Sequence, residues 1–341
     1  MACEAEGRRP TLVIGATGAV GSRLLRALAE RHGGAAVVAC VRRTPLSPEL
    51  LALGIRCERG VDVRDGASLE RAVRAHQPSV VWNLAAPLSV DTAADPAAAE
   101  DITVGGMRRL LAALDACGCD AAVCFSDSIG SFGASAPREG APARWLVANP
   151  TQDPGSDYGL QKRGCRELLR AAAERGRDTR WAVIPGVLHA DASWGGGTTE
   201  YALEAVACAA RGDVYECPVP PDARLPMINA PDLVEGLLAL QAAQRGALGE
   251  PEAGYAVAGF SFTPRELFAE LERLAPGFAW RDASAGGGAA AKFAVVWPDS
   301  LSPEAARRDL GFAPRWGLRE TVEGIFNAHR ARGASEPSAK L

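Results

Sequence analysis

The first half of the chain alternates short apolar runs with longer amphipathic segments. Thr11–Ile14 is the first run, and a helical pattern extends from Ser22 to Glu30 before the second run at Ala36–Val41. Short apolar runs separated by amphipathic helices are typical of parallel strands that are buried on both faces. The pattern therefore predicts repeated strand–helix–strand units.

The same alternation continues along the chain. The predicted elements are a strand that ends at Gly60–Asp65, a helix over Leu69–His76, a strand over Val80–Leu84, a helix over Ala97–Ala116, and strands over Ala121–Phe125 and Trp181–Ile184. Alternating strands and helices form a parallel sheet with helices on both faces. We therefore predict an α/β protein with a Rossmann-type, doubly wound parallel sheet.

Composition and charge exclude several classes of protein. The chain has 341 residues and a net charge of −4, which argues against nucleic acid as a partner. No apolar run approaches the roughly 18 residues needed to span a bilayer. Met1–Pro10 has no apolar signal core, so we expect a cytoplasmic protein. The nine cysteines are scattered and have no nearby histidine, so we predict no metal site.

A glycine-rich segment lies between the first predicted strand and its helix. Gly15, Gly18 and Gly21 give the spacing GxxGxxG, with Thr17, Ala19 and Val20 between them. In dinucleotide-binding proteins the first glycine permits a tight turn, the second lets backbone approach the pyrophosphate, and the third allows close helix–strand packing. We favour a dinucleotide site over a purely structural glycine turn.

The end of the second predicted strand indicates which dinucleotide binds. Cys40 occupies roughly the place where NAD-binding domains carry an acidic residue for the ribose hydroxyls, and Arg42 and Arg43 follow it. Either arginine could hold a 2′-phosphate, so we favour NADP over NAD; the alternative is a solvated arginine pair. Further along, Asp62 is a candidate for the adenine amine.

The C-terminal half has a less regular pattern. Its predicted elements are a helix over Gly197–Arg211, short strands over Val214–Cys217 and Met227–Asn229, a helix over Pro231–Gln244, and an exposed flexible loop over Ala285–Ala291. We divide the chain into a mainly dinucleotide-binding domain at residues 1–190, a smaller substrate lobe at 191–330 with some exchange of strands and helices, and a disordered tail at 331–341.

Tyr158 and Lys162 are four residues apart in a predicted helix and so lie on the same face. An ammonium close to a phenol favours its ionised form, which can act as a base. Lysine occurs only three times in the chain, against 34 arginines, which makes a chance match less probable. The alternative is an exposed helical pair. Ser128 follows another predicted strand, where its hydroxyl could bond a substrate oxygen beside the phenol.

The sequence resembles the extended short-chain dehydrogenase/reductases of the NAD-dependent epimerase/dehydratase superfamily, and within them the L-threonine 3-dehydrogenase group. The superfamily motifs are GATGAVG, NLAA, SDSIGSFG, YGLQK and PGVL, in this order and at suitable spacing. The subgroup motifs are GGGTT from Gly195, RLPM from Arg224, FSFTP from Phe260 and the Trp297–Pro298 pair. The resemblance extends over residues 11–329.

The resemblance implies roles for individual residues. Ser128, Tyr158 and Lys162 would be the catalytic triad: Tyr158 exchanges a proton with a secondary alcohol, Lys162 binds the nicotinamide ribose, and Ser128 stabilises the developing oxyanion. The further cofactor contacts would be Val63, Leu84, Ala85, Ala86, Pro185 and Val187. The substrate contacts would be Ser89, Asp127, Ser128, Tyr158, Gly186, Trp194, Thr198 and Thr199. A turn or cap role is the alternative for each hydroxyl. A homodimer is the family expectation.

Departures from the family pattern concern the substrate. Trp194 stands where the threonine enzymes carry an arginine suited to a carboxylate, and Asp127 adds a carboxylate that either binds a substrate amine or caps the loop. We expect hydride transfer at the β-carbon of a small hydroxy amino acid or a related compound. The alternatives are a nucleotide-sugar epimerase or dehydratase, and a non-catalytic NADP-binding regulator.

Overall fold

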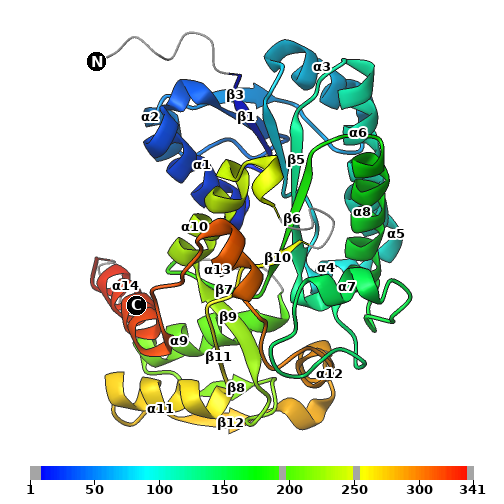
Figure 1. Cartoon of the computed structure of the whole chain (residues 1–341). Coiled ribbons are helices and arrows are strands. Elements are labelled where there is room, and N and C mark those ends of the chain that lie inside the picture. Colours follow the sequence, from blue (N-terminus) through cyan, green and yellow to red (C-terminus); the bar gives the residue numbers. More distant parts are fainter. Residues whose placement is uncertain (1–8, 192–196, 249–253, 336–341) are drawn as a thin grey trace.

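The fold is built around one large parallel sheet, shown in the computed structural model of Figure 1, which describes residues 9–191, 197–248 and 254–335. Its strands are β1 (Thr11–Ile14), β2 (Val37–Val41), β3 (Arg56–Arg59), β4 (Val80–Asn83), β5 (Ala122–Ser128), β6 (Thr179–Ile184) and β10 (Tyr255–Ala256). They are ordered β10-β6-β5-β4-β1-β2-β3, and every neighbouring pair is parallel. The predicted doubly wound sheet is confirmed.

Helices cover both faces of this sheet. They are α1 (Ala19–His32), α2 (Pro48–Ala52), α3 (Gly66–His76), α4 (Ser89–Ala94), α5 (Pro96–Glu100), α6 (Gly106–Ala116), α7 (Arg144–Ala148), α8 (Asp157–Glu174), α10 (Ala230–Ala242) and α13 (Glu304–Leu310). Figure 1 shows α3, α6 and α8 on one side and α1 on the other. A π-helical turn, η2 (Asp101–Gly105), joins α5 to α6.

The two cores follow from the two-residue period of the strands. In β1, Leu12 and Ile14 belong to the apolar cluster beneath α3, α6 and α8, whereas Val13 belongs to the cluster beneath α1 and α10. Successive side chains of a strand point to opposite faces, so an all-apolar strand supplies both cores at once. This is why the short apolar runs could be assigned to buried strands from the sequence.

The remaining elements form the lower part of the molecule in Figure 1. They are β7 (Gly186–Leu188), β9 (Leu225–Asn229) and β11 (Phe260–Phe262) in a three-stranded sheet, the pair β8 (Tyr215–Cys217) and β12 (Trp280–Asp282), and α9 (Tyr201–Arg211), α11 (Pro264–Leu274), α12 (Ala289–Val296) and α14 (Leu318–Ser335). None of the helices in the described ranges is long and apolar enough to cross a membrane.

Several predicted boundaries are wrong. Strand β3 ends at Arg59, because Gly60 adopts a φ of 71° and turns the chain out of the sheet. Residues 289–291 begin helix α12 instead of lying in a loop, since the alanines after Gly288 favour helix. Helix α14 continues through Ser335, so residues 331–335 are helical, whereas 336–341 lie outside the described residues.

Candidate active site

The carboxyl ends of β1, β4, β5 and β6 open onto one cavity of about 320 Å³. In an open parallel sheet this edge is the usual place for a ligand. The sequence-predicted residues that line it are Gly15, Gly18, Ala19, Val20, Gly21, Leu84, Ala86, Ser89, Asp127, Ser128, Tyr158, Lys162, Pro185, Gly186, Val187, Thr198 and Thr199. The structure thus brings together residues that are far apart in the sequence.

The turn between β1 and α1 depends on glycine at two positions. Gly15 has a φ of 79°, which L side chains rarely adopt, and a Cβ there would lie 2.8 Å from Ala85 N. A Cβ on Gly21 would lie 2.2 Å from the carbonyl oxygen of Gly15. The turn therefore packs directly against α1 and against the chain after β4. Its bare backbone at the helix N-terminus leaves a cradle that suits a pyrophosphate.

Helix α8 presents Tyr158 and Lys162 to the same cavity. Lys162 is buried, and its Nζ donates a 2.8 Å hydrogen bond to the carbonyl oxygen of Ser126. The same Nζ lies 5.4 Å from the centre of the Tyr158 ring, and that ring packs close to Gly130. The lysine is thus fixed at the end of β5, with its charge beside the phenol-bearing ring.

Ser128 is the last residue of β5, and its Oγ accepts a 3.1 Å hydrogen bond from the backbone N–H of Gly130. This contact makes Ser128 the N-cap of the 3₁₀ turn η3 (Ile129–Ser131). The cap role considered from the sequence is therefore real, and it coexists with a place in the cavity wall. The side chains of Ser128 and Tyr158 both line this cavity at the end of β5.

Asp127 requires a correction. Its carboxylate is completely buried, and it accepts hydrogen bonds from Arg166, from the Ser131 hydroxyl and from the backbone N–H of Ser128. These bonds direct it away from solvent and into the protein. The expectation that Asp127 binds a substrate amine is therefore not supported, and its carboxylate serves the protein's own structure.

The comparisons with known proteins agree with this geometry. The model of the NAD dependent epimerase/dehydratase family matches residues 11–251, which is most of the chain. The chain belongs to this family. An uncharacterized epimerase/dehydratase of Staphylococcus haemolyticus is 28% identical over 326 residues, covering 93% of this chain and 96% of the relative.

Two solved structures of named enzymes are similar to the whole fold. A GalE-like L-threonine dehydrogenase from Cupriavidus necator, in its holo form, is 29% identical with a TM-score of 0.83, covering 93% of this chain and 99% of that one. UDP-glucose 4-epimerase from Thermus thermophilus is 22% identical with a TM-score of 0.75, covering 95% and 99%, and shows the fold alone. The resemblance to extended short-chain dehydrogenase/reductases, and the prediction of an enzyme, are confirmed.

Membership of the epimerase/dehydratase family implies a nicotinamide cofactor, and the cavity fits one. In the turn between β1 and α1, Gly15 and Gly21 allow close packing of backbone, and the turn lines the cavity with glycine backbone that a diphosphate can approach. Leu84, Ala86 and Val187 supply apolar wall, and Tyr158 and Lys162 line the same cavity. Within the described ranges, no three His, Cys, Asp or Glu residues are grouped so as to hold a metal ion.

Not all of the predicted cofactor contacts line this cavity. Thr17 lines a neighbouring cavity of about 430 Å³, between the start of α1 and the segment after β2. Asp62 is engaged by Arg64 through both carboxylate oxygens, and Arg42 Nη1 lies 3.8 Å from it. Val63 and Cys40 are buried in the core. Two further predicted cofactor contacts, Ala85 and Arg43, also lie outside the cavity lining. Trp194, a predicted substrate contact, falls outside the described residues.

The cavity also contains residues that were not predicted as site residues from the sequence. His189, Gly197, Glu200 and Trp297 all line it. Glu200 accepts from the backbone N–H of Gly197 and so fixes the turn that carries Thr198 and Thr199. The motif that contains Trp297 was visible in the sequence, but only the fold shows that it reaches the cavity. No signal in the sequence pointed to His189.

We expect His189 to make a pH-sensitive contribution to stability. Burial, and then Arg23, lower the pKa of its imidazole, with Asp191 acting in the opposite direction. The unfolded chain therefore binds the proton more readily, and the free energy of unfolding should fall as pH drops below about 6.5. Urea titrations at about pH 7.5 and about pH 5.5 measure this fall. His189→Asn should reduce the fall in the free energy of unfolding. Burial also lowers the pKa of His329, so this residue should account for part of the fall that remains.

Proposed function

We propose that this protein is an NADP-dependent oxidoreductase. It transfers hydride between the nicotinamide and a secondary alcohol or ketone at the β-carbon of a small hydroxy amino acid or a related compound. The observation that carries the proposal is the placement of Ser128, Tyr158 and Lys162 around the cavity that the glycine turn also lines. Similarity to the L-threonine dehydrogenase of Cupriavidus necator supports the substrate class.

The side chains have separate tasks in this reaction. The nicotinamide, when bound, supplies the acceptor or donor of hydride. Tyr158 exchanges the proton with the substrate oxygen, and the Ser128 hydroxyl donates to that oxygen as negative charge develops on it. Lys162 keeps a positive charge beside the Tyr158 ring, because its bond to Ser126 O holds the ammonium at the end of β5.

The cavity wall carries several polar side chains. Ser89, Ser128, Thr198 and Thr199 all line it together with Tyr158 and Lys162. A small substrate with several polar groups can hydrogen-bond to such hydroxyls, which supports a hydroxy amino acid more than a simple apolar alcohol.

The residues after β2 support the preference for NADP. Arg42 and Arg43 occur there, and Cys40 stands at the place on the strand where NAD-binding domains carry an acidic residue. The adjoining cavity at Thr17 is also lined by Arg23 and Arg26, and by the hydroxyl residues Ser22, Thr44 and Ser47. Guanidinium groups and hydroxyls are suitable partners for a phosphate.

Arg42→Ala tests this preference. We expect the Kd for NADPH to rise about tenfold to a hundredfold and that for NADH by less than about threefold, because one charge-assisted hydrogen bond contributes about 1.5 to 3 kcal/mol. Fluorescence titration of both cofactors measures the difference. Arg71→Ala, at an exposed site on α3, should change neither Kd. Equal weakening of both cofactors would remove the phosphate argument.

Turnover decides between the proposed function and its alternatives. Cofactor affinity is measured first, and hydroxy amino acids are then screened for a change in nicotinamide absorbance. Turnover of such a compound supports the proposal. Tight NADPH binding with no turnover of any alcohol or ketone would favour a regulator, and conversion of nucleotide sugars would favour an epimerase or dehydratase. We further propose a cytoplasmic homodimer, with residues 1–190 mainly cofactor-binding and 191–330 mainly substrate-binding.

A further inference from the structure

A buried ion pair lies directly behind Ser128. Arg166 Nη1 contacts Asp127 Oδ2 and donates a 2.9 Å hydrogen bond to Ser131 Oγ. Asp127 Oδ1 in turn accepts from the Ser131 hydroxyl and, at 2.8 Å, from the backbone N–H of Ser128. These contacts close a ring around the turn at residues 127–131.

Arg166 lies on the same face of α8 as the two proposed catalytic residues. Tyr158, Lys162 and Arg166 follow one another at intervals of four, which places them in a row along the helix. Lys162 bonds to the carbonyl oxygen of Ser126, and Arg166 bonds to the carboxylate of Asp127. The helix that carries the phenol is therefore tied to consecutive residues of the strand that carries Ser128.

Stability alone does not account for this pair. The Asp127 side chain is 0% exposed and that of Arg166 is 7% exposed. Removing two charges from water costs about as much as their attraction returns, and apolar residues of similar volume often serve equally well. The arginine also packs at 5.6 Å from the Trp181 ring. The buried ion pair is therefore better explained by holding the turn at residues 127–131 in place than by stability alone.

We propose that Arg166 is a positioning residue that fixes Ser128 through Asp127, an inference that rests on the proposed role of Ser128. With Arg166 present, the carboxylate of Asp127 is held where it accepts the Ser128 N–H and the Ser131 hydroxyl together. Without it, the buried carboxylate loses its guanidinium partner and is expected to turn away from these donors. That movement releases the Ser128 amide and loosens the turn that aims its hydroxyl at the substrate oxygen.

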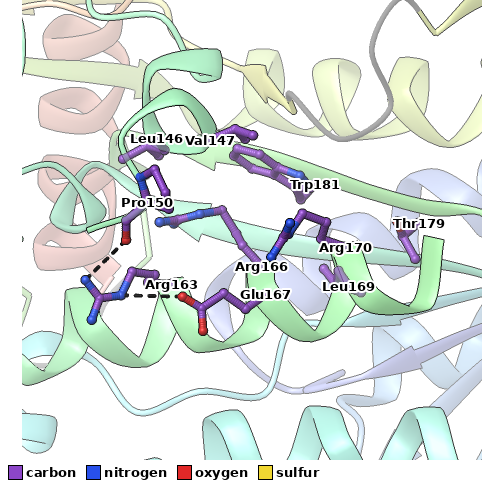
Figure 2. A pocket seen from close by; sticks show the side chains of 10 residues that line it. All are labelled: Leu146, Val147, Pro150, Arg163, Arg166, Glu167, Leu169, Arg170, Thr179 and Trp181. Carbon is purple, nitrogen blue, oxygen red and sulfur yellow. Dashed lines mark hydrogen bonds and ion pairs between the residues drawn. The ribbon is translucent and has the colours of Figure 1, made fainter. Parts of the chain in front are cut away.

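The surroundings of Arg166 allow a direct test. Figure 2 shows its side chain in the wall of a pocket of about 130 Å³, together with Trp181 and two further arginines of α8, Arg163 and Arg170. Arg170 lies one turn further along α8, where its exposed side chain pairs with Glu174, so it is a matched control. The pocket also gives a small guanidinium ion a route to the place that Arg166→Ala would vacate.

The experiment compares Arg166→Ala, Arg170→Ala and Ser128→Ala in the full chain. For Arg166→Ala we expect kcat with the hydroxy amino acid found in the screen to fall about 10- to 100-fold, with KM and the Kd for NADPH within about threefold, because small misplacements are costly in catalysis. Amide exchange of residues 126–132, followed by mass spectrometry, should become faster. Guanidinium chloride at a low, non-denaturing concentration should restore part of the lost kcat and slow the amide exchange of residues 126–132. Arg170→Ala should behave as the unmodified protein.

The outcomes separate this inference from the proposed function. If Ser128→Ala lowers kcat but Arg166→Ala keeps the unmodified kcat, the positioning role is wrong and the proposed function stands. If Ser128→Ala itself retains full turnover, the proposed triad is wrong. Should Arg166→Ala not fold, Arg166→Lys replaces it, since one ammonium cannot bond Asp127 and Ser131 in the same geometry. For Arg166→Lys we expect faster amide exchange at residues 126–132 and a several-fold lower kcat. Faster exchange with unchanged kcat overturns the inference.

Discussion

Tyr158→Phe is expected to lower kcat by about 10²- to 10⁴-fold, the usual contribution of a positioned acid or base. The ring packs close to Gly130 and beside Lys162, and phenylalanine preserves these contacts. Fold and cofactor affinity should therefore be retained, with a Kd for NADPH within about twofold. Steady-state kinetics with the hydroxy amino acid from the screen, and NADPH titration, measure the two quantities.

Tyr255→Phe provides a matched control for the loss of a hydroxyl. Tyr255 belongs to β10 and its hydroxyl donates to Asp309, away from the cavity. We expect this variant to keep its turnover. Undiminished kcat in Tyr158→Phe would sink the assignment of the phenol as proton donor and acceptor, whereas equal losses in both variants would indicate a general effect on stability.

Gly21→Ala is expected to weaken NADPH binding by more than about tenfold and to lower the free energy of unfolding by about 1 to 3 kcal/mol, as overpacking usually does. The new Cβ would lie 2.2 Å from Gly15 O and 3.1 Å from Ala16 Cα. Both are backbone atoms, so no side chain can move aside. Helix α1 must shift away from the turn, and its N-terminus then no longer faces the pyrophosphate.

Gly66→Ala is the control for this change. Gly66 is the first residue of α3, and a Cβ there would meet nothing within 4 Å. Since alanine favours helix over glycine, stability should be equal or slightly higher, and NADPH affinity should be unchanged. Chemical unfolding and cofactor titration report on both variants. If Gly21→Ala binds NADPH normally, the turn is not the pyrophosphate site.

The sequence was sufficient for the elements whose physics is local. Strand β1, the glycine turn and the Tyr158–Lys162 spacing each follow from a few neighbouring residues. Ser128 was placed at the carboxyl end of a strand because parallel strands present these ends at one edge, but the strand itself was predicted to end at Phe125 and continues to Ser128. Helix α12 was missed since the glycines before Ala289 outweighed the helix propensity of the alanines after them.

Contacts between distant residues could not be inferred in this way. Asp127 stood at the right place in the sequence for a substrate contact, but the direction of its carboxylate is set by Arg166, 39 residues later. His189 enters the cavity only because β7 leaves the large sheet and pairs with β9. Such placements depend on how the elements pack, which periodicity does not specify.

The position of β10 has a consequence for dividing the molecule. After the second sheet has begun with β7 and β9, the chain returns and pairs β10 with β6 at the edge of the large sheet, and α10 packs against α1. A fragment ending after β7 would leave backbone groups of β6 unpaired and the apolar side of α1 uncovered. An open edge of this kind recruits strands from other chains. Expressed alone, residues 1–190 would therefore tend to aggregate, and we expect the described chain to fold as one unit.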